Sequence, residues 1–461
     1  MWVALVRMLL ERFLSLGQTH DGRSPALWFA HIVAFYVALH VTLGAVLVKV
    51  AKIDWKKASA LVGMGLVLGT LPPLIDVAIS GRGHFSYEYV PGFIPWSLHR
   101  PPRVLPWGET IVLWATIALM TVAVLRATRS ILRAVLGALV SYACVLVFLV
   151  GLPAASQWLS RDSGVAPSEW RGMLFGAITL CSLIVSLGLT RRALERIPQI
   201  LLPPLFGLLG AGLKGPLTPA VWLVVAFLAF FGAAFALSND WYDRREDAAQ
   251  GRATPLDGDG AQWLSVLPLV FALHVLVLRV EAGLCLIGFS IVAHAYHADP
   301  LRLKCVFPLS YKTEGLLGGL ALVAGLTAAP EIQPATWQLW AALAVAIGTP
   351  AALVFKDAKD VDADASAGVK TAFVFAETHG WPRRRTELIS AALLLISLGV
   401  VTAMLHSLRA LQPMLTSMLG LLALTAGVLA AFGGSPKRRV YAALLTAEAH
   451  LGFSAWVLAT Q

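Results

Sequence analysis

Two acidic segments in the second half of the chain combine residue types and spacings that suit metal-assisted phosphate chemistry. They read NDWYDRRED at 239–247 and KDAKDVDAD at 356–364. In each segment three aspartates follow the spacing i, i+3, i+7, and these residues are Asp240, Asp243, Asp247, Asp357, Asp360 and Asp364. On an α-helix this spacing places each trio on one narrow stripe, which Asp362 falls off. The pattern therefore predicts two faces from which three carboxylates project together.

Carboxylates grouped in this way repel one another unless a cation joins them. Oxygen ligands without sulfur suit Mg²⁺, which is commonly held by carboxylates together with substrate phosphate oxygens. We therefore predict that the six aspartates bind two Mg²⁺ ions bridged by a diphosphate, with Asn239 as a neutral ligand or an orienting group. The alternative is a pair of solvated acidic loops. Two identical spacings, each directly after a long apolar segment, favour the metal site.

Basic residues near these segments are candidates to contact a diphosphate by charge-assisted hydrogen bonds. Arg302 and Lys304 lie in the segment YHADPLRLK at 296–304, which also contains Tyr296. Lys356 and Lys370 flank or follow the second acidic cluster. The alternative role of these cations is to set the orientation of the chain in a membrane.

The elements that must position these residues are apolar helices. The chain has 461 residues, of which 58% are hydrophobic and 13% charged, whereas soluble domains average roughly 25% charged residues. About fourteen apolar segments approach the ~20 residues that a membrane-spanning helix needs. We therefore predict an all-α, polytopic integral membrane bundle, with about five helices before residue 190 and about nine between 198 and 459.

Charge distribution predicts the topology. The net charge is +10, and the basic residues cluster in short loops beside the apolar segments, as the positive-inside rule describes. This pattern argues against nucleic acid as a partner. It places both acidic clusters and the 296–304 segment on the cytoplasmic face, so that an active site there would face the cytoplasm.

A domain boundary is predicted near residue 191, where the charged stretch RRALERIP precedes a proline-rich apolar segment. Residues 1–190 then form an N-terminal multi-helix membrane region of unknown role, and 191–461 form the domain with the acidic clusters. Residues 2–17 are expected to form an amphipathic helix at the membrane interface. Asp76 lies within an apolar segment, and a structural role is favoured for it.

The motifs of 191–461 resemble those of the UbiA superfamily of intramembrane prenyltransferases. The resemblance rests on NDxxDxxxD at 239–247, on YHADPLRLK at 296–304 and on KDAKDVDADASAGVKT at 356–371, in this order. It covers about the last 270 residues. One departure is Thr254 before Pro255, where family members commonly carry an Arg-Pro pair.

The resemblance implies Mg²⁺-dependent transfer of an isoprenyl group from an isoprenyl diphosphate to a lipophilic acceptor of aromatic, quinone or chlorin type. Asn239 and the six aspartates would be the catalytic set, and the five flanking residues named above would bind the substrate. Membrane helices would exclude water from the reactive allylic cation and hold the lipid chain. The sequence does not select between the acidic residues and Tyr296 as the group that takes a proton from the acceptor. Nor does it give the length of the prenyl chain.

A polytopic transporter or a lipid-binding membrane protein is the competing hypothesis. The extra helices before residue 190 are compatible with it, but a transporter is expected to show inverted repeats and broken midplane helices. Neither is evident in the sequence, and such a protein does not require paired aspartate clusters.

Overall fold

The computed structural model describes residues 2–14, 25–81, 107–244, 258–328, 334–409 and 412–460. Most of these residues are helical, and none of them lies in a strand, as the composition predicts. Thirteen of the described helices are long and apolar enough to cross a membrane. A further helix, α15 (Leu309–Leu326), is less apolar because its first turns carry Lys312 and Glu314. The protein is an integral multi-pass membrane protein with an all-α fold.

The chain divides into two compact units. The first comprises Met1–Arg191 together with Leu256–Leu278, and the second comprises Arg192–Pro255 together with Arg279–Gln461. The division therefore falls near the predicted boundary at residue 191, but one later segment belongs to the first unit. That segment forms α13 (Gly258–Leu278), which packs on α2 (Pro25–Val46) and α8 (Pro167–Ser186). The roles predicted for the two regions stay predictions.

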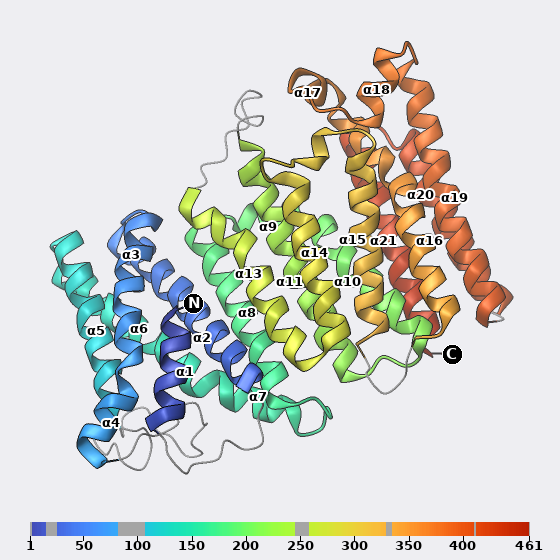
Figure 1. Cartoon of the computed structure of the whole chain (residues 1–461). Helices are drawn as coiled ribbons and strands as arrows, with labels where there is room; N and C mark the ends of the chain where they lie inside the picture. The colour runs from blue at the N-terminus through green and yellow to red at the C-terminus, as the bar shows by residue number, and fades with distance from the viewer. Residues whose placement is uncertain are drawn as a thin grey trace. The chain divides into compact units, whose positions relative to one another are not determined.

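The other long helices of the first unit come from residues 2–160 of the chain (Figure 1). They are α1 (Trp2–Leu14), α3 (Trp55–Leu66), α4 (Pro72–Ser80), α5 (Trp107–Thr128), α6 (Ile131–Leu146) and α7 (Leu152–Ser160). Helix starts carry recognisable signals. The Asp54 side chain accepts a hydrogen bond from the Lys57 amide at the start of α3, and Pro72 and Pro167 occupy first turns, where proline costs no hydrogen bond.

Helix α1 is oriented differently from the predicted interfacial helix. Its charged residues Arg7 and Glu11 are buried, whereas Trp2 and Phe13 are exposed. Arg7 contacts Glu11 at 2.5 Å, Glu109 of α5 at 2.5 Å and the Gly69 carbonyl at 2.9 Å. A helix at the interface would turn its charges to water, but here the charges find partners inside the unit and the apolar side chains face outward.

Asp76 has the structural role that the sequence favours. Its carboxylate accepts a hydrogen bond of 2.7 Å from the Gly108 amide at the start of α5, and the residue is 2% exposed. It therefore links α4 to the first turn of α5, where backbone N–H groups lack partners within the helix.

Eight long helices of the second unit form a closed ring in which each packs against the next. In ring order they are α14 (Val280–His297), α15, α16 (Thr336–Leu353), α19 (Arg383–Arg409), α20 (Pro413–Phe432), α21 (Pro436–Thr460), α10 (Ile197–Lys214) and α11 (Pro219–Tyr242). Helices α10 and α15 also pack on one another across the ring (Figure 1). Shorter elements join the long ones, namely α9 (Thr190–Glu195), η6 (Leu303–Cys305), η7 (Val354–Lys359), α17 (Val361–Ser366) and α18 (Ala372–Thr378).

Glycines allow the close approach of α10 and α15. A side chain at Gly325 would collide with the backbone of Gly207, and one at Gly210 would collide with the backbone of Leu322. Small residues at such crossings let helix backbones touch within a membrane. This contact fixes the register of the two helices, and with it the positions of Gln199 and Glu314 near their first turns.

Candidate functional site

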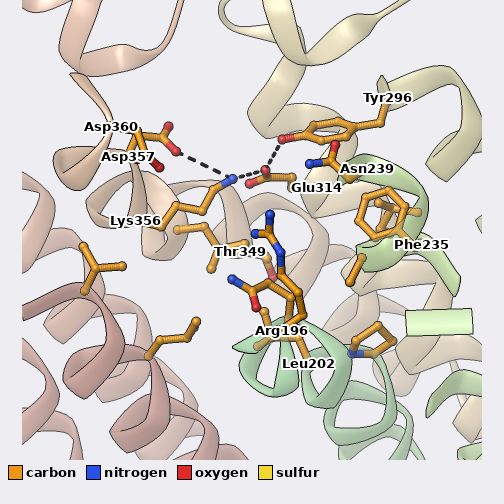
Figure 2. A pocket seen from close by; sticks show the side chains of 18 of the residues that line it. Arg196, Leu202, Phe235, Asn239, Tyr296, Glu314, Thr349, Lys356, Asp357 and Asp360 are labelled. Carbon is orange, nitrogen blue, oxygen red and sulfur yellow. Dashed lines mark hydrogen bonds and ion pairs between the residues drawn. The ribbon is translucent and has the colours of Figure 1, made fainter. Parts of the chain in front are cut away.

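A cavity of about 330 Å³ lies within the second unit. Its wall contains five carboxylates and three cationic side chains, which are Asp243, Glu314, Asp357, Asp360, Asp364, Arg196, Lys356 and Lys359. The apolar part of the wall comes from α10, α11, α14, α15, α16 and α21, and it includes Leu202, Phe206, Phe235, Phe289, Leu317, Leu353 and Leu444. Figure 2 shows Glu314, Asp357, Asp360 and Lys356 together, with Leu202 farther away. The cavity thus joins a charged region to an apolar one.

The first acidic cluster lies at the end of α11. Asn239 and Asp243 line the cavity, and the Asn239 amide donates a hydrogen bond of 2.7 Å to Asp243. Asp243 also pairs with Lys304 and lies 4.0 Å from Arg302. Asp240 does not line the cavity, is 1% exposed, and pairs with Arg196. Asp247 lies outside the described residues.

The second cluster lines the same cavity with all three of its aspartates. The prediction that these three aspartates share one continuous α-helix is wrong. Asp357 lies in the 3₁₀-helix η7, Asp360 interrupts the helix with φ −119° and ψ 10°, and Asp364 lies in α17. The break follows Pro350 in α16 by about three turns. Asp362 points away as expected, because it is largely exposed and pairs with Arg383 at 2.6 Å.

Tyr311 holds Asp357 in place. Its hydroxyl donates a 2.5 Å hydrogen bond to the Asp357 carboxylate and accepts one of 2.9 Å from the Ala372 amide. The same side chain therefore connects α15, the second cluster and the start of α18. Lys359 contacts Asp360 at 2.6 Å, so both of these carboxylates contact side chains of the protein.

Asp364 carries the clearest electrostatic signature of a cation site. Burial, together with the charges of Asp357 and Asp360, raises the pKa of Asp364 to about 7. Carboxylates that share a site in this way resist simultaneous ionisation unless a cation is added. Asn239 gives a second indication of a cation site, because its side-chain carbonyl oxygen is buried and receives no hydrogen bond from the described residues.

These residues fit Mg²⁺ by their chemistry. The donor set is oxygen only, and Mg²⁺ is usually bound by one or two carboxylates plus phosphate oxygens. In the described part of the chain no three His, Cys, Asp or Glu side chains are gathered closely enough to hold a metal ion by themselves. A site built from this cavity would thus be completed by substrate oxygens.

A third group of polar side chains spans the cavity. Glu314 of α15 pairs with Lys356 and accepts a 2.6 Å hydrogen bond from the hydroxyl of Tyr296 on α14. Lys356 also lies 3.7 Å from Asp357. Figure 2 shows this chain of contacts running from Tyr296 through Glu314 and Lys356 to the acidic cluster. Two of the predicted substrate-binding residues, Tyr296 and Lys356, therefore meet at one carboxylate.

The remaining predicted substrate-binding residues lie elsewhere. Lys304 lies in η6, pairs with Asp243, and has a side chain that is 10% exposed. Arg302 directly precedes η6 and has a left-handed backbone conformation with φ 37°. Neither lines the cavity, although both reach a residue that does. Lys370 is exposed and also lies outside the cavity wall.

Sequence reasoning missed several cavity residues. They include Gln199 on α10, Glu314 on α15 and Thr349 on α16, with Arg196 directly before α10. Tyr311 on α15, which was also missed, does not line the cavity but contacts Asp357, which does. None belongs to a spaced motif, and Arg196 lies in the charged stretch RRALERIP at the predicted domain boundary. An ionisable residue in an apolar segment is a functional signal in its own right, and Glu314 fits that description.

Comparison with known proteins identifies the class. The model of the UbiA prenyltransferase family matches residues 200–447. This match spans more than half of the chain, and the protein belongs to that family. No curated protein matches the sequence.

Solved structures show a distant likeness. A UbiA homologue from Archaeoglobus fulgidus bound to DMAPP and Mg²⁺ is 17% identical, with a TM-score of 0.42, over 58% of this chain and 99% of that chain. The homologue bound to GPP and Mg²⁺ is 16% identical, with a TM-score of 0.42, over 58% of this chain and 99% of that chain. A structure of digeranylgeranylglyceryl phosphate synthase is 14% identical, with a TM-score of 0.41, over 59% of this chain and 100% of that chain.

Proposed function

We propose that the protein is a Mg²⁺-dependent intramembrane prenyltransferase that works in the cavity of the second unit. It would transfer an isoprenyl group from an isoprenyl diphosphate to a lipophilic acceptor and release diphosphate. The observation that carries the proposal is that Asp243, Asp357, Asp360 and Asp364 line one cavity that also has an apolar wall. Membership of the UbiA prenyltransferase family supports it, and known UbiA homologues bind DMAPP or GPP with Mg²⁺.

The charged region suits the diphosphate. Asn239 and the aspartates that line the cavity would hold two Mg²⁺ ions, while Asp240 and Asp247 stay predicted ligands. When bound, Mg²⁺ neutralises the charge that develops on the leaving diphosphate. Lys356 and Lys359 lie at the same wall, and Arg302 and Lys304 adjoin Asp243, so that these cations would stabilise the same oxygens.

The apolar region suits the reactive carbon and its chain. Leu202, Phe206 and Phe289 line the same cavity, and apolar walls exclude the water that would capture an allylic cation. The lipid acceptor would enter from the membrane. The Lys/Arg-rich loops support a cytoplasmic orientation of the charged region.

The deciding experiment measures diphosphate release by the purified full-length protein with geranylgeranyl or farnesyl diphosphate, Mg²⁺ and a lipid extract. Asp243→Ala and Asp360→Ala are expected to lower release by at least about 100-fold, because each removes a carboxylate that would hold the Mg²⁺ needed to neutralise the leaving diphosphate. Asp362→Ala is the matched control, since Asp362 is exposed and pairs with Arg383. Equal release by all four proteins would contradict the site. An absence of release from the unaltered protein would favour a transporter or a lipid-binding protein.

A further inference from the structure

One carboxylate in the cavity belongs to neither aspartate cluster. Glu314 lies on α15, five residues after the helix begins, and its side chain is 10% exposed. It lines the cavity beside Leu317 and Gly318 on the next turn. Its position therefore differs from that of the aspartates, which lie at the end of α11, in η7, in α17 or at the break between η7 and α17.

The two oxygens of Glu314 have different surroundings. Oε1 accepts the Tyr296 hydroxyl at 2.6 Å and pairs with the Lys356 ammonium. Oε2 is buried and receives no hydrogen bond from the described residues. A buried acceptor without a donor is unfavourable, and more so when it is charged. A ligand that enters the cavity can supply the hydrogen-bond donor that this oxygen does not receive from the described residues.

The partners of Oε1 fix the direction of Oε2. Tyr296 comes from α14 and Lys356 from η7, so Glu314 is held from two sides (Figure 2). Its orientation is thus set by side chains that are themselves part of the wall. Preorganisation of this kind is what a group needs in order to orient a reacting partner.

We propose that Glu314 recognises and deprotonates the acceptor, and that the acceptor therefore presents a neutral hydroxyl group, as a lipophilic phenol or alcohol does. This proposal rests on the function proposed above. The acceptor hydroxyl donates to Oε2 of Glu314. As the C–O bond to the diphosphate breaks, its electron pair leaves with the diphosphate. The acceptor oxygen, or a ring carbon conjugated with it, forms the new bond to the prenyl carbon, and the hydroxyl proton passes to Oε2.

The charge of the wall argues against a carboxylic acid as the acceptor. A carboxylate next to Glu314 would place two like charges together in a partly apolar cavity, which is unfavourable. The ammonium of Lys356 is already paired with Glu314 and lies near Asp357. A hydroxyl supplies the missing donor without adding charge.

The test uses full-length protein, geranylgeranyl diphosphate, Mg²⁺ and four probes: a long-chain 4-alkylphenol, its methyl ether, the matching 4-alkylbenzoic acid and a long-chain alcohol. Unaltered protein is expected to prenylate the phenol or the alcohol, but neither the ether nor the acid. Glu314→Gln is expected to lower product formation by about 100-fold or more, the usual contribution of a positioned base. Glu314→Asp should retain part of the activity.

A second measurement separates this role from a structural one. Binding of a non-hydrolysable prenyl diphosphate analogue with Mg²⁺ should change by less than about threefold in Glu314→Gln, because the aspartates are unaltered. Glu377→Gln is the matched control, since Glu377 lies outside the cavity wall and contacts Arg383 at 2.7 Å. It should behave as the unaltered protein does.

Several results would overturn the proposal. One is prenylation of the phenol by Glu314→Gln at the unaltered rate, and another is preference for the acid or the ether. Loss of analogue binding in Glu314→Gln would assign the residue to the diphosphate site instead. If the unaltered protein releases diphosphate but accepts neither phenol nor alcohol, only the present proposal fails. If it releases none from any prenyl diphosphate, the proposed function fails as well.

Discussion

Tyr311 shows how single side chains organise the charged region of the cavity. It lies on α15, donates to Asp357 and accepts from the Ala372 amide. Asp357 therefore has a fixed orientation before any ligand arrives. Groups that orient a metal ligand typically change metal affinity by 10–100-fold when they are removed.

Tyr311→Phe is accordingly expected to raise the Mg²⁺ concentration needed for half-maximal diphosphate release by about tenfold. The maximal rate at saturating Mg²⁺ should fall much less, because the carboxylate itself remains. A Mg²⁺ titration of the release rate checks this. Tyr441→Phe is the matched control, since Tyr441 lines the same cavity from α21, and an equal shift in both variants would contradict the role of Tyr311.

Arg196 and Asp240 make a second prediction at this scale. Asp240 is 1% exposed and pairs with Arg196. Arg196→Ala removes that cation from a buried carboxylate, and losses of this kind cost about 3–5 kcal/mol. The midpoint of thermal unfolding should fall, and adding Asp240→Asn to Arg196→Ala should restore part of it. A double variant less stable than Arg196→Ala would argue against the pair.

At the scale of elements, α1 illustrates a helix whose charges hold it inside the first unit. Arg7 bridges Glu11 of the same helix, Glu109 of α5 and the Gly69 carbonyl. Apolar side chains such as Trp2 and Phe13 cover the opposite face. In a bilayer this arrangement lets charges pair in the protein interior, where charged residues of membrane helices normally lie.

Arg7→Ala is therefore expected to destabilise the first unit by about 3–5 kcal/mol, since it leaves Glu11 buried without its cation. Arg12→Ala on the same helix is the control, because Arg12 is exposed. Thermal unfolding of the two variants in the same detergent checks the difference. Similar midpoints for both would show that the Arg7 contacts contribute little.

Across the second unit, ligand binding should couple to stability. Asp364, Asp357 and Asp360 come together from η7, α17 and the break between them, and burial together with repulsion from the other two carboxylates raises the pKa of Asp364. A bound cation offsets this repulsion. Anything that binds only the folded state stabilises it, by about 2.7 kcal/mol at a concentration 100 times its Kd.

Mg²⁺ together with a non-hydrolysable prenyl diphosphate analogue should therefore raise the midpoint of thermal unfolding, and EDTA should abolish the increase. Diphosphate release should likewise be lost with EDTA and return with added Mg²⁺. Asp360→Ala is expected to lose most of the ligand-dependent increase, whereas Asp362→Ala should keep it. An increase that survives EDTA would contradict metal-dependent binding.

Much of the fold and part of the site could be predicted from the sequence. Helical class and membrane character follow from composition and from the lengths of the apolar segments, because a bilayer imposes both. The second aspartate cluster could be found because its spacing is local, and its residues line the cavity even though Asp360 interrupts the helix. The break itself could not be predicted, because the i, i+3, i+7 pattern is equally compatible with one continuous helix.

By itself, the amino-acid sequence determined what depends on neighbours along the chain: the apolar helices, the two aspartate motifs and the family that their order indicates. Only the tertiary structure decided which separate elements meet. It grouped α13 with α2 and α8, turned Arg7 inward, and brought Glu314 to Tyr296 and Lys356. The physical reason is that the sequence around a single charged residue on a helix does not show which residue it will contact. Its partner is fixed by how helices pack, and that packing rests on close contacts such as Gly325 against Gly207, between residues distant in the chain.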